Sequence, residues 1–393
     1  MKNKKLPGTD LETVMPLLIN IWRRYHKLSG PQDALQTREF RGVVAAVETL
    51  QKGLETGQAL IGTDYFSKPE LLGAYLLYQW VIHYQQGLSL INEMPITPKR
   101  VLDIGSGLAP FAFAALRHDA RDVIALDRNL TALNLGAEVC GRYGFPLTIR
   151  RHNCLRQPFP VEGTFDLITI GHCLEELFPE SQKGWNIQQQ DWVTSLFSLL
   201  NPEGYILFVE SSLPHVNRRL LMLRDILVKQ GVPVQAPCVW QGECPALQTK
   251  NSPCYAQRPL EKPYLIKEIQ RAAQINLGSL KMSYLLIKNP VAGWPKLATS
   301  APLYRVISPP IEVDQSKRYY LCGVDGKKNL GSHLKQHPLE SRAFDYLKRG
   351  ELISIDGALE KQNRFEIILG TRVTVEAAIG KPIPEVYQNV DSD

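Results

Sequence analysis

The chain has 393 residues, of which 44% are hydrophobic and 21% charged, and its formal net charge is +6. This composition is typical of a globular protein of two or three domains. It contains no apolar run long enough to cross a bilayer, and residues 1–9 lack the features of a secretion signal or transit peptide, so we expect no membrane partner and a cytoplasmic, bacterial setting. The seven cysteines favour thiols, metal ligands or small buried residues over disulfides.

Residues 1–97 are predicted to form a helical N-terminal region. A capping-box pattern at Thr9 to Glu12 starts one helix, and Ser67 to Glu70 repeats the pattern with a proline in the first turn. The apolar residues that follow are spaced for one helical face: Val14, Leu18, Ile21 and Trp22, and then Leu71, Ala74, Tyr78, Val81 and Ile82. We expect these helices to cover a sheet.

Residues 98–290 alternate short apolar runs with helical stretches, which predicts an α/β doubly wound parallel sheet. The predicted strands are 101–104, 123–126, 147–149, 165–170, 205–209 and 280–287, and the predicted helices lie near 109–118, 129–143, 188–199 and 215–230. A Pro- and Cys-rich insertion with little periodicity occupies residues 232–263.

Residues 300–380 are predicted to form a small β-rich C-terminal module. Its expected strands are 318–323, 351–355, 365–369 and 372–376, and the last dozen residues have the composition of a tail.

The segment Val101 to Gly107 predicts a nucleotide-cofactor loop between a strand and a helix. Gly105 and Gly107, on either side of Ser106, permit a tight turn and close backbone approach to a ligand. Pro110 stands where a dinucleotide fold would place its third glycine, and no Gly-Lys-Ser/Thr follows, so NAD and P-loop sites lose support.

Three further polar residues fit S-adenosylmethionine, and they predict the class I methyltransferase variant of the Rossmann-like fold. Asp103 at the strand end suits the amino acid portion of the cofactor, through water. Asp127 ends the next strand, where a carboxylate can accept both ribose hydroxyls, and Asn153 can contact the adenine. NAD is the main competing cofactor.

The residues that would carry out methyl transfer are not identified by the sequence. The loop after the fourth strand, Gly171 to Leu177, has no Asn/Asp-Pro-Pro-Tyr tetrad, and Cys173 lacks the context of a pyrimidine-methylating nucleophile. Glu176 or His172 could face the site, yet either could equally cap the following helix.

Four cysteines lie late in the chain: Cys238, Cys244 and Cys254 in the insertion and Cys322 in the C-terminal module. Their spacing lacks the paired knuckles of structural zinc. Ligation by four thiolates suits an iron–sulfur cluster or zinc, and the spacing alone leaves open whether these thiols bind a metal at all.

From about Pro69 to Gly326 the chain resembles the methyltransferase-like protein 17 family of small-ribosomal-subunit assembly factors. The matching residues are Pro69-Glu70, Ala74-Tyr75, Leu102 to Gly107, Leu174 to Leu177, Val209 to Pro214, Ala236 to Cys238, Cys244-Pro245, Cys254, Arg258, Leu321-Cys322 and Asp325-Gly326. The chain departs from the family at Val239-Trp240, Pro253, Tyr255 and Glu210 to Pro214, but all four cysteines are present.

The resemblance implies an S-adenosylmethionine-binding protein that acts on the small ribosomal subunit and touches its RNA, with no DNA partner. It also implies a [4Fe–4S] cluster, with zinc as the alternative, held by Cys238, Cys244, Cys254 and Cys322, which would pin the C-terminal module to the core. A eukaryotic member would work in the mitochondrial matrix. The enzymatic prediction leans towards an rRNA methyltransferase, with a non-catalytic assembly factor and a zinc-containing small-molecule methyltransferase as alternatives.

Basic side chains fit an RNA partner without requiring one, because such pairs are common on solvated surfaces. They occur at Arg23-Arg24, Arg150 to His152, Arg218-Arg219, Lys327-Lys328 and Lys348-Arg349.

Overall fold

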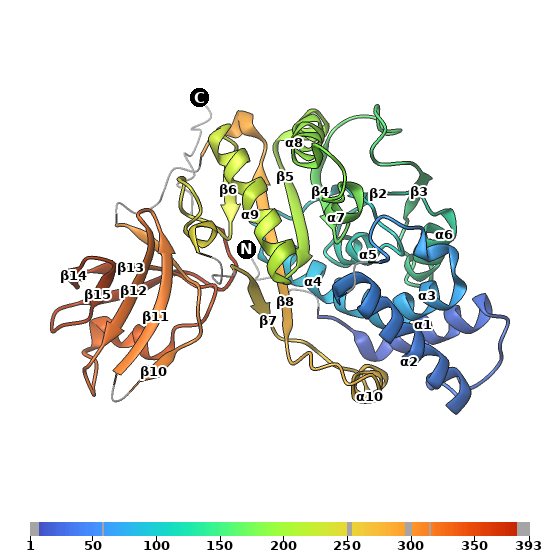
Figure 1. Cartoon of the computed structure of the whole chain (residues 1–393), viewed down its shortest axis with the longest axis horizontal. Coiled ribbons are helices and arrows are strands. Elements are labelled where there is room, and N and C mark those ends of the chain that lie inside the picture. The colour runs from blue at the N-terminus through green and yellow to red at the C-terminus, as the bar shows by residue number, and fades with distance from the viewer. Residues whose placement is uncertain (1–7, 57–58, 250–253, 295–300, 314–315, 383–393) are drawn as a thin grey trace, which may run out of the picture. The chain divides into compact units, whose positions relative to one another are not determined.

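The computed structural model describes residues 8–56, 59–249, 254–294, 301–313 and 316–382 (Figure 1). The chain divides into two compact units. The first contains residues 1–92, 96–213 and 258–282, and the second contains 93–95, 214–257 and 283–393. Most of the predicted tail, from residue 383 onwards, lies outside the described residues. No helix in the described ranges is both long and apolar enough to span a membrane.

The first sheet has the strand order β3-β2-β1-β4-β5-β8-β6, with β7 paired to β8 off this path. Its strands are β1 (Arg100–Ile104), β2 (Asp122–Asp127), β3 (Thr148–Arg151), β4 (Phe165–Gly171), β5 (Leu200–Ser211), β6 (Val234–Ala236), β7 (Ala256–Arg258) and β8 (Leu280–Lys288). Strands β1 to β5 pair in parallel, whereas β6 runs antiparallel to β8. The late strand β8 lies between β5 and β6, and this strand order is typical of class I methyltransferases. The predicted fold class is therefore confirmed.

Helices follow the strands of this sheet as the alternating pattern predicts. They are α5 (Pro110–Arg117), α6 (Leu130–Arg142), α7 (Leu174–Leu177), α8 (Trp185–Leu196) and α9 (Pro214–Lys229). Strand β1 shows why the apolar runs become central strands, because Val101, Leu102 and Ile104 are all completely buried. The sequence missed β6 and β7, which are three-residue strands inside the insertion.

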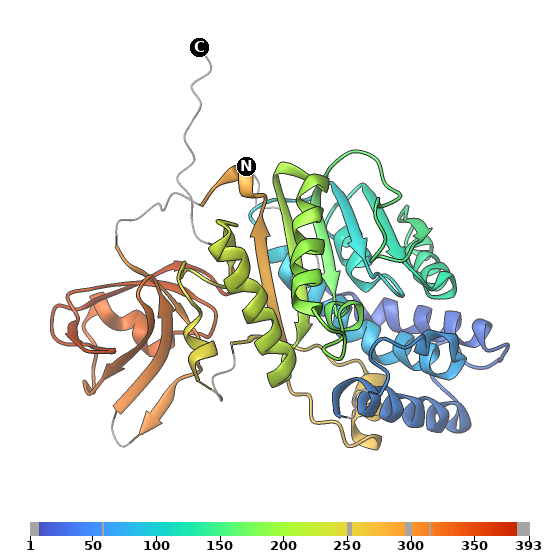
Figure 2. The same ribbon diagram turned by 45° about the horizontal axis from the view of Figure 1, so that its top comes forward.

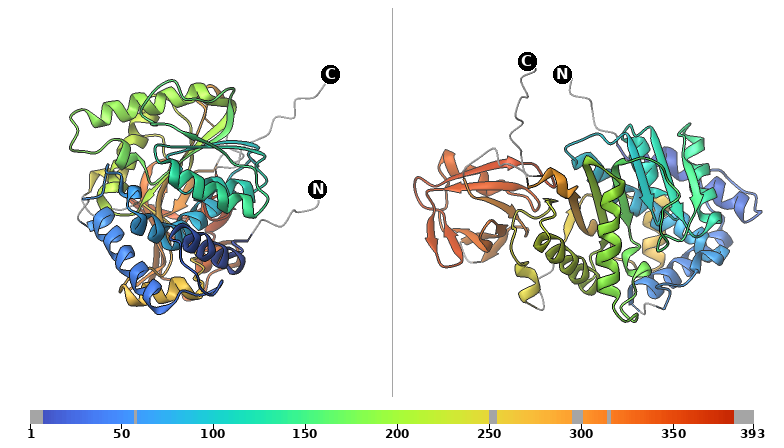
Figure 3. Two further views of the ribbon diagram at one scale, coloured as in Figure 1. Left: turned by 90° about the vertical axis from the view of Figure 1, so that its right-hand side faces the viewer. Right: turned by 90° about the horizontal axis from the view of Figure 1, so that it is seen from above.

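The N-terminal region is helical, as predicted. Its helices are α1 (Leu11–Tyr25), α2 (Thr37–Gln51), α3 (Pro69–Ala74) and α4 (Trp80–Glu93), with a π-helical stretch, Tyr75–Gln79, joining the last two. The buried indole N–H of Trp80 donates to the Leu108 carbonyl at 2.9 Å, and its ring packs on Phe113 of α5. A later helix, α10 (Tyr264–Ala272), lies beside α2 (Figure 3).

Both predicted capping boxes are wrong. Helix α1 begins after Asp10 and α3 begins after Lys68, and neither residue makes a side-chain cap bond. The Thr9 hydroxyl instead donates to Glu261, and the Ser67 hydroxyl donates to the Asp64 carbonyl at 2.6 Å. The two hydroxyls therefore serve other partners, as short polar side chains readily do.

The C-terminal module is β-rich, as predicted, with the strand order β14-β15-β12-β11-β9-β13-β16 and β10 paired to β11 (Figure 2). Its strands are β9 (Leu303–Val306), β10 (Ile311–Val313), β11 (Ser316–Gly323), β12 (Gly326–Ser332), β13 (Leu352–Asp356), β14 (Leu359–Lys361), β15 (Arg364–Glu366) and β16 (Arg372–Ala377). The predicted strand 365–369 stops at Glu366, since the Ile368 N–H turns to the Thr371 hydroxyl.

At Gly136, helix α6 packs directly against the backbone of Leu108, in the segment after β1. A Cβ at Gly136 would lie 2.6 Å from the Leu108 carbonyl oxygen, closer than backbone can tolerate. Gly136→Ala is expected to destabilise the fold by about 1–3 kcal/mol, as overpacking does. Gly141→Ala on the same helix meets nothing within 4 Å and should stabilise it by about 1 kcal/mol. Urea unfolding of the two variants checks this contrast, and equal midpoints would contradict it.

Candidate functional site

The loop after β1 is held in place by the end of β2. Gly105 and Gly107 have φ angles of 68° and 53°, which only glycine adopts without strain. The Ser106 N–H donates to the Leu126 carbonyl at 3.0 Å, and the Gly107 N–H donates to Asp127 Oδ2 at 2.9 Å. The loop therefore presents its backbone beside the Asp127 carboxylate.

Asp103 lies beneath this loop and joins three elements. Its buried carboxylate accepts hydrogen bonds from the Ser106 hydroxyl at 2.5 Å, the Thr169 hydroxyl at 2.6 Å and the Ala112 N–H at 3.2 Å. Burial raises the pKa of Asp103 to about 6, although these hydrogen bonds oppose the shift. Asp103 thus ties the loop to β4 and α5.

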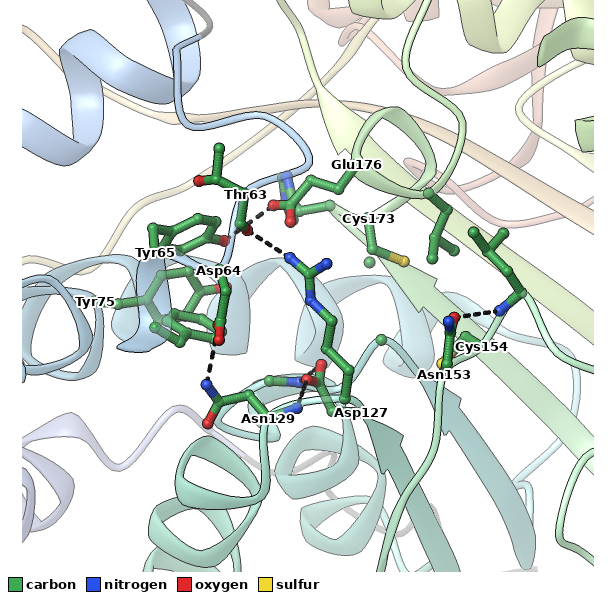
Figure 4. Close-up of a pocket in the computed structure, with 18 residues that line it drawn as sticks. Thr63, Asp64, Tyr65, Tyr75, Asp127, Asn129, Asn153, Cys154, Cys173 and Glu176 are labelled. Carbon is green, nitrogen blue, oxygen red and sulfur yellow. Dashed lines mark hydrogen bonds between the residues drawn. The ribbon is translucent and has the colours of Figure 1, made fainter. Parts of the chain in front are cut away.

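A cavity opens above the carboxyl ends of β1, β2 and β4 (Figure 4). The empty space within it, including the open mouth, is about 860 Å³. Of the six residues predicted to bind cofactor, Gly105, Gly107, Asp127 and Asn153 line this cavity. Asp103 and Ser106 do not line it, so a role for them in cofactor binding stays a prediction.

Asp127 is a half-buried acid in the cavity wall. Its second oxygen, Oδ1, accepts a hydrogen bond from the Asn129 N–H at 2.8 Å, and burial raises the pKa of this carboxyl. Asn153 lies on the neighbouring wall, where its side-chain oxygen accepts from the Leu155 N–H at 3.1 Å.

Residues 63–66 also line the cavity, although they precede the first strand by more than thirty residues. Arg128 donates to the Thr63 carbonyl, and the Asn129 amide donates to Asp64 at 3.1 Å. The Tyr65 hydroxyl donates to Glu176 at 3.0 Å. Sequence reasoning missed this segment because only the adjacent aromatic pair, Tyr65-Phe66, marks it locally.

The loop after β4 brings His172, Cys173 and Glu176 to the cavity. The His172 ring stacks on His83 of α4, with ring centres 3.8 Å apart, and burial lowers the pKa of His172 to about 4. Burial also raises the pKa of the Cys173 thiol. The pKa of Glu176 rises to about 7 because the carboxyl is buried.

All four late cysteines belong to the second unit, together with α9 and the C-terminal sheet. They are free, and Cys238 lies near enough to raise the pKa of Cys244, Cys254 and Cys322, in addition to the larger effect of burial. The pKa of Cys322 reaches about 12 and that of Cys244 about 11. Even so, among the described residues no three His, Cys, Asp or Glu side chains are placed to hold a metal ion.

Helix α9 fixes the loops that carry these cysteines. The Asn217 amide donates to the Cys254 carbonyl at 2.6 Å, and Asp225 accepts from the Cys244 N–H at 2.9 Å. Buried Arg224 donates to the carbonyls of Trp240 and Gly242. Val239 of the insertion also packs with Leu303 and Leu352 of the C-terminal sheet.

Several of the predicted basic residues are engaged within the protein. Arg23 is buried and forms an ion pair with Glu39, Arg219 is buried, and Lys328 lies between Asp325 and Glu360. These three side chains are therefore not part of an exposed basic surface.

The model of a family described as mitochondrial small ribosomal subunit Rsm22 matches residues 80–340 of this chain. No curated protein matches this chain.

Similar solved structures include the N-methyltransferase NodS of Bradyrhizobium japonicum WM9 with S-adenosyl-L-homocysteine, at 15% identity and TM-score 0.35 over 53% of this chain and 85% of that one. An O-methyltransferase family protein from Burkholderia thailandensis has 13% identity and TM-score 0.37 over 66% and 74% of the two chains. A ribosomal protein L11 methylase from Lactobacillus delbrueckii subsp. bulgaricus has 16% identity and TM-score 0.32 over 53% and 77%.

Asp103→Ala is expected to lower the free energy of unfolding by about 2–3 kcal/mol, because it leaves buried donors without an acceptor. Thr169→Val removes one of these bonds and keeps the shape, so it should cost only about 1 kcal/mol. Urea unfolding measures both. Equal costs would contradict the role of Asp103 as the shared acceptor.

Proposed function

Because the chain belongs to the Rsm22 family of mitochondrial small ribosomal subunit proteins, we propose that it binds S-adenosylmethionine and methylates the RNA of that subunit. The family match over residues 80–340 is the observation that carries the proposal. The proposed location is that of the ribosome it serves, the cytoplasm of a bacterium or the mitochondrial matrix of a eukaryote.

The cavity residues fit this cofactor. Doubly wound sheets bind ligands outside the carboxyl ends of their strands, at the point where the strand order reverses, and the cavity lies there, between β1 and β4. Asp127 and Asn153 both line the cavity, which supports the proposal that Asp127 accepts the ribose hydroxyls and Asn153 contacts the adenine. The glycines leave room for the backbone to approach the ligand. The cofactor supplies an electrophilic methyl group on a sulfonium.

Asp127→Asn is expected to weaken S-adenosylmethionine binding by about 10- to 100-fold, since hydrogen bonds to a charged acceptor contribute about 1.5–3 kcal/mol. The new amide oxygen could still accept from one of the Gly107 and Asn129 N–H groups, while its NH2 group would face the other. Asp122→Asn, at the exposed start of the same strand, is the matched control and should bind normally. Isothermal titration calorimetry measures both affinities.

Single-turnover assays with labelled cofactor on immature small subunits test the transfer itself. Label in the subunit RNA supports the proposal. Absence of label from a protein that demonstrably binds the cofactor and the subunit would contradict methyl transfer and favour a non-catalytic assembly factor.

We also propose that Cys238, Cys244, Cys254 and Cys322 hold a [4Fe–4S] cluster. Ligation by four thiolates suits an iron–sulfur cluster, and Cys238 lies near enough to raise the pKa of Cys244, Cys254 and Cys322. Among the described residues, no three His, Cys, Asp or Glu side chains are placed to hold a metal ion. Arg224 and Lys327 lie near enough to stabilise the thiolate form of Cys322. The cluster would order the insertion against the C-terminal sheet.

Cys322→Ser should lose the iron and make the C-terminal module more sensitive to protease. Anaerobic purification is expected to give a coloured protein with about four irons per chain, as a Cys₄ cluster of this type requires. Cys140→Ala, a buried cysteine of α6, is the control and should keep its iron. A colourless protein with one zinc and no iron would overturn the cluster.

A further inference from the structure

The carboxyl groups of two half-buried residues, Asp127 and Glu176, lie on opposite sides of the cavity (Figure 4). Asp127, on the β2 side, is occupied by the backbone N–H groups of Gly107 and Asn129. Glu176 comes from α7, in the loop region after β4, which is the acceptor side of this fold. The proposed cofactor interaction uses Asp127 and leaves Glu176 without a role.

Glu176 is held in position by the N-terminal region. Its Oε1 accepts a hydrogen bond from Tyr65 at 3.0 Å, and Tyr65 is itself buried. Burial raises the pKa of Glu176 to about 7, against the Tyr65 hydrogen bond and the charge of Arg128, while Asp127 and Glu175 raise it further. A carboxyl group in this range is well matched to proton transfer at neutral pH.

The two cysteines of the cavity, Cys173 and Cys154, are unsuited to attacking a substrate. Burial raises the pKa of the Cys173 and Cys154 thiols, so both stay protonated, and Cys173 Sγ contacts the Ile104 carbonyl at 3.6 Å. A cysteine nucleophile for carbon methylation needs a thiolate. These two thiols do not provide one.

The His172 imidazole is also held in its neutral form. Its Nε2 lies 2.7 Å from Gln86 Oε1, and the Gln86 amide nitrogen donates to the Lys281 carbonyl at 3.5 Å. Gln86 therefore accepts the Nε2 proton of His172. Burial and the stack on His83 oppose a second proton on the ring.

We propose that Glu176, positioned by the Tyr65 hydroxyl, accepts the proton that the substrate atom loses on methylation. The inference rests on the proposed function of the cavity. The acceptor atom forms a bond to the methyl carbon, the carbon–sulfur bond breaks with its electron pair left on sulfur, and the acceptor's proton moves to the Glu176 carboxylate. The positive charge of the sulfonium and the negative charge of the carboxylate are lost together.

This assignment restricts the class of substrate. The acceptor is a nitrogen or oxygen that carries a proton, such as an amine, a ring N–H or a hydroxyl of the RNA. Methylation of a pyrimidine carbon needs a cysteine thiolate, and burial of Cys173 and Cys154, which raises the pKa of both thiols, opposes its formation.

The test compares the full-length wild type with Glu176→Gln, Tyr65→Phe and the control Glu180→Gln, whose side chain is exposed just beyond α7. In single-turnover assays on immature small subunits, Glu176→Gln should slow transfer by about 10²- to 10⁴-fold. Its affinity for S-adenosylhomocysteine, measured by calorimetry, should stay within a factor of two or three of the wild type, on the order of a few tenths of a kcal/mol.

The pH profile gives a signature that a purely structural role would not produce. The carboxylate form of Glu176 exists above its pKa, so the wild-type rate should rise with pH up to about 7 and then level off. Tyr65→Phe removes a donor that favours the carboxylate, so its midpoint should move to higher pH. Glu180→Gln should keep the wild-type profile.

Thermal unfolding provides a readout independent of transfer. Since burial raises the pKa of Glu176 above its ordinary 4.5 to about 7, the wild type should lose stability from this group as pH rises between those values. Glu176→Gln should therefore gain melting temperature relative to the wild type from pH 5 to pH 8. The melting temperature of the Glu180→Gln control should follow that of the wild type across this pH range.

The outcomes separate the two proposals. An active wild type with an equally active Glu176→Gln variant overturns the role of Glu176 alone. If Glu176→Gln loses as much cofactor affinity as rate, the proton-accepting role of Glu176 is also overturned. Label found on a pyrimidine carbon overturns that role as well. A wild type that binds cofactor and subunit but transfers nothing overturns the proposed function, and the proton-accepting role with it.

Discussion

The pocket depends on one buried carboxylate, that of Asp103. It accepts bonds from the cofactor loop, from β4 and from α5, so it fixes the loop relative to the strand that leads to Glu176. The two walls of the cavity therefore keep a constant separation. Because a buried acid without partners is strongly unfavourable, each of the three donors helps to stabilise this arrangement.

The sequence predicted the features that short segments determine. Apolar runs located the parallel strands, and Gly105, Gly107 and Asp127 marked the loop, because each signal lies within about one strand and one turn. It missed Tyr65, which meets Glu176 across 111 residues of chain, and His83, which meets His172 through ring stacking. The contact partners of such residues are chosen by tertiary packing, which leaves no local pattern.

The cysteines illustrate a different limit. Their spacing left a metal site undecided, and only the family resemblance joined Cys322 to the three in the insertion. Within the second unit, α9 holds the insertion by side chains such as Asn217 and Asp225, which no cysteine motif contains. These polar side chains of α9 thus fix the main chain of the loops that carry Cys244 and Cys254.

The stacked pair of His83 and His172 also has a consequence for how much acid the protein tolerates. Both residues are half-buried, and the partial burial of the imidazoles lowers the pKa of each, to about 4 for His172. An unfolded histidine takes up its proton near pH 6.5, so the stability that this pair contributes is present above that value and is lost as the pH falls towards 4. Acidification below pH 6.5 should therefore weaken the contact between His83 of α4 and His172 of the loop after β4, and with it the packing of the N-terminal helices on the acceptor side of the pocket.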